Sequence, residues 1–386
     1  MDFKNLGTAR SVFIAIAVVA VVAAFATAAS VMGVRTARAE PRTTTTFTPA
    51  IATKIPRPTS GVAFVPPGGA DLWVGPDRDP FFRIHEGVAL GYLHRSEGWL
   101  LVTTMCNDTA WVSAEDVIVQ PQHEPAATGA SFDVADAVIV LDPGHGDRDW
   151  GGVGPTGLSE KEVNLDIADR VRNLMESPRH IDWDTGVVSP GDDVAAFGSV
   201  VLSRDVVGPN GGDFEAGLGY RSTIATAAGA DAFVSIHNNT VPRVDTDIPG
   251  SEVYYSIAAE GSDRLAGLIY QELLRSFAGF DADWQGGELL GARARIDPET
   301  GDDYYGLMRR ATSPAVIVEG VYISEPEEEA LLATEAFREA YAEAVYRGVV
   351  RFLTTAEEGE GVNDPEYFHY DSGTVSGNGC ALPAQP

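Results

Sequence analysis

Short apolar segments alternate with amphipathic helical patterns throughout residues 137–353. The apolar segments are rich in Val and Ile, which is typical of strands buried in a sheet. The alternation predicts an α/β domain, with a mainly parallel sheet flanked by helices. The expected strands are 137–141, 200–203, 232–236, 252–255 and 315–318, and the clearest expected helices are 160–177, 262–277 and 335–352.

Three of these expected strands lead directly into a side chain that can bind a metal or transfer a proton. These side chains are His145, which follows an Asp-Pro-Gly turn, His237 and Glu319. The two glycines beside His145, Gly144 and Gly146, would let the backbone turn sharply and expose the imidazole. Because sites in open α/β sheets form at the carboxyl ends of the strands, we expect the three side chains at one edge.

Glu160 is a fourth candidate, although its position alone leaves its role open. Ser159 and Glu162 fit a capping box, which places Glu160 in the first turn of a helix. An acid there would gain a few tenths of a kcal/mol from the helix dipole. Two histidines and a carboxylate with an open fourth position also form a common catalytic zinc set, and a further carboxylate can act as general base. Residue types and spacing favour neither interpretation.

Several motifs in order resemble those of the zinc-dependent N-acetylmuramoyl-L-alanine amidases, a family of bacterial cell-wall hydrolases. The resemblance extends over residues 137–353, more than half of the chain, and the quoted motifs together are highly specific. The motifs occupy residues 139–147, 157–161, 202–205, 229–239, 250–255 and 314–319.

The resemblance implies that His145, Glu160 and His237 are the ligands of one zinc ion and that Glu319 is the catalytic residue. It implies hydrolysis of the amide bond between N-acetylmuramic acid and the L-alanine of the stem peptide in peptidoglycan. Arg204 and Arg221 also fit recurring positions of the family, and for Arg221 a structural role and a substrate contact stay open.

Two segments are interpreted as insertions relative to the family, residues 180–199 and 279–303. Insertions near a sheet-edge site can control access or peptide choice, and surface decoration is the simpler interpretation. Small departures occur at Asn238, where the family often has alanine, and at Gly320-Val321. Neither departure removes a functional side chain.

The remaining chain predicts further modules around the α/β domain at 137–355. Short β-rich pieces at 61–120 resemble a small bacterial SH3-like barrel, which could bind wall components or be purely structural. We expect a Thr/Pro-rich linker at 40–60, a connector at 121–136 and an acidic disordered tail at 356–386.

The N-terminus, residues 1–39, has the pattern of a signal peptide or a membrane anchor. Lys4 and Arg10 precede an uncharged apolar run at 11–34, and Arg35 and Arg38 follow it. The run is long enough to span a bilayer, and a small-residue cleavage pattern lies just before Glu40. Both interpretations place the remainder outside the cytoplasm, secreted or anchored.

The charge balance limits the partners of the chain. Asp and Glu number 56 against 27 Lys and Arg, which gives a formal net charge of -29. A chain of this charge is not expected to bind nucleic acid or anionic lipid. A membrane contact is expected only through the N-terminal segment, peptidoglycan is the expected substrate, and a protein activator stays open.

The two cysteines, Cys106 and Cys380, are too few for a disulfide scaffold and lack a metal-type spacing. They could pair in an oxidising compartment, but their separation favours an interpretation as free thiols.

The main alternative to an active amidase is a silent or autoinhibited wall-binding protein on the same fold. The N-terminal barrel, the insertions and the acidic tail motivate this alternative. A zinc peptidase that cuts peptide bonds is a weaker one. The intact order of His145, Glu160, His237 and Glu319 favours the active enzyme.

Overall fold

The computed structural model describes residues 61–368, apart from 105, 107, 126, 147, 148, 205–217 and 289. The predicted leader and linker lie outside this range, and so do residues 369–386 of the predicted tail. Within the described part of the chain, no helix combines the length and the apolarity that a membrane span requires. The described residues belong to one compact unit, Pro56–Pro386.

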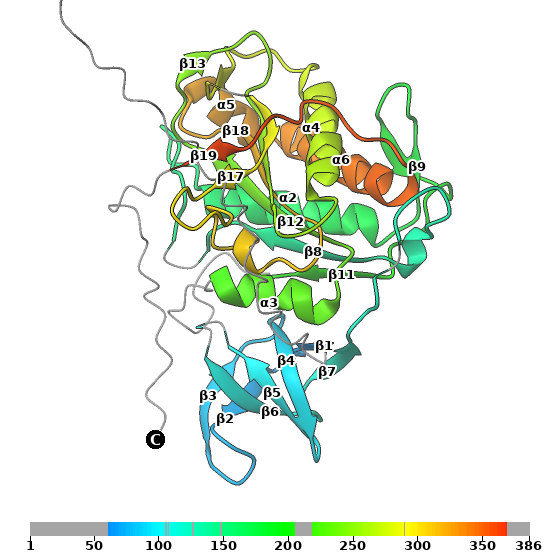
Figure 1. Ribbon diagram of the computed structural model, residues 1–386, viewed down its shortest axis with the longest axis vertical. Helices are drawn as coiled ribbons and strands as arrows, with labels where there is room; N and C mark the ends of the chain where they lie inside the picture. Colours follow the sequence, from blue (N-terminus) through cyan, green and yellow to red (C-terminus); the bar gives the residue numbers. More distant parts are fainter. Residues whose placement is uncertain are drawn as a thin grey trace, which may run out of the picture. The chain divides into compact units, whose positions relative to one another are not determined.

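A six-stranded sheet lies at the centre of the α/β part (Figure 1). Its strands, in spatial order, are β11 (Ser199–Leu202), β8 (Val138–Pro143), β12 (Ala232–Asn239), β18 (Ala315–Tyr322), β14 (Glu252–Tyr255) and β16 (Gly291–Arg293). Neighbouring strands are parallel except at the antiparallel pair of β14 and β18. The prediction of an α/β fold with a mainly parallel sheet is therefore confirmed.

Helices cover both faces of this sheet (Figure 1). One face packs against α2 (Glu160–Met175), α4 (Ser262–Phe277) and α6 (Glu335–Thr354), and the other against α3 (Leu218–Ala228). Alternate strand residues supply the two cores: Ile139 and Leu141 face the first group, and Val138 and Val140 face α3. Full burial of each such aliphatic side chain stabilises the fold by about 1.5–3 kcal/mol. A short helix, α5 (Pro326–Leu332), precedes α6.

Seven short strands precede the α/β part and form one antiparallel sheet. They are β1 (Gly61–Phe64), β2 (Ala70–Trp73), β3 (Pro80–Ile84), β4 (Ala89–Ser96), β5 (Trp99–Thr103), β6 (Thr109–Ser113) and β7 (Ile118–Pro121). Their buried residues share one apolar core with α3 and the adjacent face of the central sheet. The hydroxyl of Tyr220 on α3 also donates a hydrogen bond to the carbonyl of Ala89. The small β domain therefore packs directly on the α/β part, and its SH3-like character stays a prediction.

The two predicted insertions contain regular structure. Residues 180–199 contribute to a hairpin of β9 (Arg179–Ile181) and β10 (Val188–Pro190). Residues 279–303 supply the edge strand β16, β15 (Gln285–Gly286), which pairs with β13 (Val244–Asp245), and β17 (Arg295–Ile296). Surface decoration is therefore the wrong interpretation for β16, because this strand completes the central sheet. Two 3-10 turns, η1 (Val134–Asp136) and η2 (Met308–Arg310), complete the described elements.

The prediction of a disordered tail is wrong for residues 356–368. Within this segment, β19 (Glu366–Tyr367) pairs in parallel with β17. The amide of Ala292 also donates to Gly361, and the amide of Asn363 donates to Ala292. The backbone groups of an edge strand need partners, and the acidic chain supplies them despite its composition. The interpretation of the cysteines as free is also wrong, because Cys106 is disulfide-bonded.

Candidate metal centre

The predicted site residues meet at the carboxyl-terminal side of three adjacent strands. His145 follows β8 after a tight turn, and His237 and Glu319 lie side by side in the parallel register of β12 and β18. Both of these lie within their strands, His237 two residues and Glu319 three residues before the last, whereas the sequence pattern placed them after the strand ends. The strands continue because their backbone groups still find partners beyond the apolar run.

Glu160 begins α2 and its side chain is buried, with 2% exposed. Ser159 is the N-cap as predicted, but its side chain makes no capping hydrogen bond. Its hydroxyl instead donates to the carbonyl of Trp150 at 3.4 Å. The predicted capping box is therefore incomplete, because the serine hydroxyl donates its hydrogen bond to the loop before α2 and caps no helix amide.

The carboxylate of Glu160 lies between the two histidines. Its Oε2 atom is 3.1 Å from Nε2 of His145, and its Oε1 atom is 3.2 Å from Nδ1 of His237. One ligand atom from each of the three residues lies within 4.8 Å of the others, so this trio could hold a metal ion. Backbone amides also donate to the carboxylate, from Gly152 at 2.6 Å and Asn238 at 3.0 Å.

The hydrogen bonds and the burial of the trio shift the pKa of each of its members. Burial opposes the ionised carboxylate, yet hydrogen bonds from His145 and His237 hold the pKa of Glu160 well below its usual range. Burial likewise opposes the charged imidazolium of His145, but its hydrogen bonds to Asp149 and Glu160 raise its pKa to about 10. Burial lowers the pKa of His237, which favours the neutral imidazole that metals bind.

Asp149 orients His145 from outside the trio. Its Oδ2 atom is 2.7 Å from Nδ1 of His145, so Nε2 is left facing Glu160. A carboxylate that fixes the second nitrogen of a histidine is the usual outer partner of a metal-binding imidazole. The trio and Asp149 line an open pocket of about 590 Å³, which also includes Glu319.

The turn that carries His145 has an unusual backbone. His145 itself has a φ of 61°, which residues other than glycine rarely adopt, and such a conformation costs on the order of 1–3 kcal/mol. Gly144 allows a close approach, because a Cβ atom there would lie 2.2 Å from Nε2 of His237. The glycines were predicted to adopt the unusual backbone conformations of this turn, but His145 also adopts one of them.

Two arginines, the half-buried Arg204 and the buried Arg221, hold this turn in place. Arg204 donates to the carbonyls of Pro143 and Gly144, both at 2.9 Å. Arg221 donates to the carbonyls of Pro143 at 2.9 Å and of His145. Arg221 also pairs with the buried carboxylate of Asp142 at 2.9 Å. The structure therefore favours the structural alternative for Arg221 over a substrate contact.

Replacing Arg221 by methionine is expected to lower the free energy of unfolding by about 3–5 kcal/mol, because Asp142 would keep a buried charge without its cation. Urea unfolding would measure this loss. The control is Arg172→Met, which removes a half-exposed ion pair to Asp169 and should cost about 0–1 kcal/mol. Equal losses in the two variants would contradict the structural role of Arg221.

Glu319 has the surroundings of a proton-transfer group. Its Oε2 atom is buried and has no hydrogen-bond partner among the described residues. Burial, followed by the negative charges of Glu160 and Glu252, raises its pKa above the usual range. A carboxylate with a free oxygen beside a metal-type trio can accept a proton and release it again.

Sequence reasoning missed several residues around the site. Asp149 carries a weak signal, since it lies four residues after His145. Glu252 is an acid inside an expected buried strand, and it lies directly opposite Glu319 in the register of β14 and β18. The hydroxyl of Tyr341 on α6 lies 3.0 Å from the carbonyl oxygen of His237 and 3.2 Å from that of Val318, and it shares its one proton between them. For Tyr341 the sequence shows only the apolar spacing of a helix.

Comparison with known proteins gives a consistent set of relatives. A family model described as N-acetylmuramoyl-L-alanine amidase matches residues 139–351. The N-acetylmuramoyl-L-alanine amidase LytC of Bacillus subtilis is 32% identical over 222 residues, which cover 57% of this chain and 36% of LytC. The amidase AmiA of Escherichia coli is 27% identical over 272 residues, which cover 62% of this chain and 84% of AmiA.

Among solved structures, the N-acetylmuramoyl-L-alanine amidase AmiC2 of Nostoc punctiforme is 30% identical. The match covers 56% of this chain and 97% of that chain, with a TM-score of 0.40. The similarity to LytC spans only about a third of that relative, and the matched family segment leaves out the small β domain of this chain.

Proposed function

Since the chain belongs to the N-acetylmuramoyl-L-alanine amidase family, we propose that it hydrolyses the amide bond between N-acetylmuramic acid and L-alanine in peptidoglycan. One zinc ion is the proposed cofactor. The observation that carries this proposal is the trio of His145, Glu160 and His237 beside the carboxylate of Glu319, whose Oε2 atom has no hydrogen-bond partner among the described residues. The relatives support action outside the cytoplasm, at the cell wall.

The donor set fits zinc. Two imidazoles and one carboxylate are ligands that Zn²⁺ prefers, and catalytic zinc sites keep a further position open. The ligand atoms already lie within 4.8 Å of one another. The outer partner Asp149 and the two backbone amides fix His145 and Glu160 in place. No large rearrangement of these side chains is needed to bring the donors to one ion.

In the proposed mechanism, His145, Glu160 and His237 would hold the zinc ion, with Asp149 orienting His145. A bound zinc ion polarises a carbonyl and lowers the pKa of water to about 7. Glu319, which lines the same pocket, accepts a proton from the attacking water and passes it to the departing amine. Tyr341 keeps the strands of His237 and Glu319 in fixed relation through its two hydrogen bonds.

The proposal is tested by incubating the segment 40–386 with purified peptidoglycan and identifying the soluble products by mass. An amidase releases intact stem peptides that begin with L-alanine and leaves glycan without peptides. We expect this release, its loss on treatment with a chelator and its return on addition of zinc. Release of shorter peptides would indicate a peptidase instead.

Absence of any product would favour the alternative of a silent or autoinhibited protein. The segment 61–368, which keeps the small β domain and the core it shares with α3, would then be assayed in parallel to test whether the chain outside it is inhibitory. A protein activator would be indicated if both forms bind zinc and neither releases product.

A further inference from the structure

A second, smaller pocket adjoins the metal centre. Its volume is about 200 Å³, and it shares Asn239 and Thr240 with the pocket around the metal-type trio. Its other wall comes from the edge strand β16 and the β17–β19 pair, which the sequence did not assign to the site. The charged residues of the lining are Arg243, Glu252, Glu288, Arg293, Arg295 and Glu366.

Arg293 on β16 is the charged residue of this lining whose side chain lacks hydrogen-bond partners among the described residues. Only 2% of it is exposed, and its Nε and Nη2 atoms are buried without any hydrogen bond among the described residues. A buried guanidinium normally forms a pair or a full set of hydrogen bonds, because an unpaired buried charge is costly. The unmet donors of Arg293 therefore indicate an anionic ligand, most simply a carboxylate, whose two oxygens match the guanidinium fork.

The other buried charges of the lining are already satisfied. Arg295 pairs with Glu366 at 3.1 Å and donates to the hydroxyl of Tyr305 at 2.7 Å. Glu252 accepts hydrogen bonds from the hydroxyls of Tyr254 and Tyr322 and from the amide of Asn239. These contacts keep both groups engaged, so neither takes the place of a ligand for Arg293.

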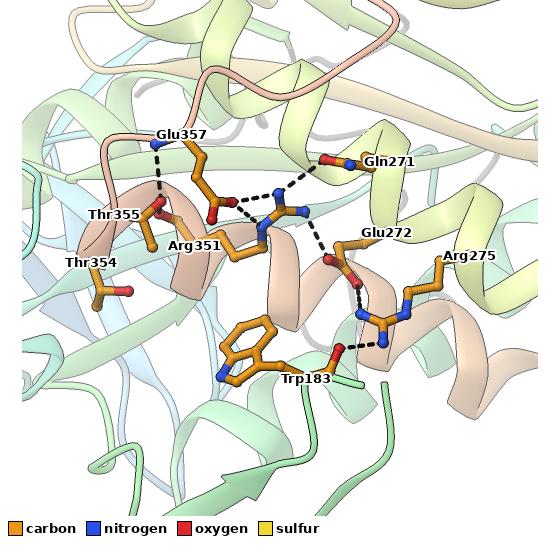
Figure 2. A pocket seen from close by; sticks show the side chains of 8 residues that line it. All are labelled: Trp183, Gln271, Glu272, Arg275, Arg351, Thr354, Thr355 and Glu357. Atoms are coloured by element: carbon orange, nitrogen blue, oxygen red, sulfur yellow. Dashed lines mark hydrogen bonds and ion pairs between the residues drawn. The ribbon is translucent and has the colours of Figure 1, made fainter. Parts of the chain in front are cut away.

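A pocket elsewhere in the fold shows the contrast (Figure 2). This pocket, of about 660 Å³, also contains arginines, but its charges pair with one another. Arg351 contacts Glu272 at 2.8 Å as well as Glu357, and Arg275 contacts Glu272 at 4.0 Å (Figure 2). These two guanidinium groups are therefore paired with carboxylates, whereas Nε and Nη2 of Arg293 have no partner among the described residues.

The sheet places Arg293 at a suitable distance from the reaction. β16 is two strands away from β18, which carries Glu319, and neighbouring strands are about 4.8 Å apart. The lateral separation of the two backbones is therefore about 10 Å. A peptide advances about 3.3–3.6 Å per residue, so a group on the second or third residue of a bound stem peptide reaches this distance.

We propose that Arg293 is a specificity-determining residue that binds the free α-carboxylate of the second residue of the stem peptide. Where this residue is unamidated D-glutamate, its α-carboxylate is free because the peptide continues through the γ-carboxyl group. The inference rests on the proposed amidase function, and it names a substrate contact within that function.

Two synthetic N-acetylmuramoyl tripeptides test the inference, one with the D-glutamate α-carboxylate and one with the corresponding carboxamide. Wild-type protein loaded with zinc should cleave the carboxylate form with a kcat/KM at least about tenfold higher, mainly through a lower KM. Arg293→Gln should reduce this preference to about one, and Arg293→Lys should retain part of it. The control is Arg310→Gln, which removes an exposed arginine outside this lining and should leave the preference intact.

Equal cleavage of both substrates by the wild type would overturn the inference and leave the amidase function standing. A full preference in Arg293→Gln, or an equal loss of preference in Arg310→Gln, would overturn the assignment to Arg293. If Arg293→Gln does not fold, the wild-type ratio and Arg293→Lys decide. If the wild type cleaves neither substrate, the proposed function fails, and calorimetric binding of the free tripeptides tests the inference instead. Binding of the carboxylate form alone would support the pocket. Equal binding of both forms, or no binding, would overturn it.

Discussion

Replacing Glu319 by glutamine is expected to leave zinc bound and to lower kcat by about 10²–10⁴-fold, the usual contribution of a positioned proton-transfer group. Glutamine has nearly the same volume as glutamate, so the packing between β12 and β14 should be kept. The amide cannot accept a proton from the attacking water at neutral pH. The loss should therefore appear in kcat rather than in KM, and steady-state kinetics on a soluble N-acetylmuramoyl peptide would measure it.

The matched control is Glu162→Gln on α2, which makes the same chemical change at an exposed position two residues from Glu160. This variant should keep both zinc and activity. Zinc content by mass spectrometry separates a loss of proton transfer from a loss of the metal. Normal turnover in Glu319→Gln would exclude the assigned mechanism, and zinc loss in that variant would show that Glu319 supports the metal site instead.

The fold was predictable where the apolar pattern is strong. The expected helix at 262–277 has the bounds of α4, and the other two expected helices differ from α2 and α6 only at their ends. The strand at 252–255 also has the bounds of β14. In these segments the local pattern and the tertiary packing agree, because a core-facing stripe determines both.

The edge of the central sheet was not predictable in this way. β16 is a short strand that contains the charged Arg293, and β19 lies in an acidic segment with the composition of a disordered tail. Both are held by backbone pairing with neighbours distant in the sequence, such as Asn363 with Ala292. Amino-acid composition indicates which side chains can be buried, but it does not indicate which backbone groups will need hydrogen-bond partners.

The site was predictable in its donors and less so in their supports. His145, His237 and Glu319 could be placed at one edge because each follows an expected strand, but residue spacing left Glu160 open and the structure brings it between the histidines. The supports act through the backbone, as Arg204, Arg221 and Tyr341 do by donating to carbonyls. Carbonyl groups are identical at every position, so no sequence pattern marks those contacts.

The small β domain shows the same limit at the level of domains. Its strands follow from alternating apolar residues, but the shared core with α3 depends on Gly91. A Cβ atom at Gly91 would lie 3.1 Å from the side chains of Thr223 and Ala227 on α3. The sequence presents this glycine as an ordinary strand residue. A linker-separated module was therefore expected, whereas the structure shows one continuous packing unit from Pro56 onward.

Replacing Glu160 by glutamine is expected to abolish zinc binding and, with it, all metal-dependent turnover. The wild type should carry about one zinc per chain, and the variant close to none. The carboxylate lies 3.1 and 3.2 Å from the two imidazoles, so its loss removes both a ligand and the negative charge of the trio. The two interpretations of Glu160 predict very different losses, because an acid that only interacts with the helix dipole contributes a few tenths of a kcal/mol.

Zinc content and thermal unfolding with and without a chelator would measure both consequences. A ligand that binds only the folded state at about 1,000 times its Kd stabilises it by about 4 kcal/mol, so the wild type should lose several degrees of Tm on chelation. Glu160→Gln should already have the lower Tm and should not respond to the chelator. The control Glu162→Gln should behave as the wild type does. Retention of zinc by Glu160→Gln with only a small change in Tm would assign Glu160 to helix stabilisation and leave the metal to other donors.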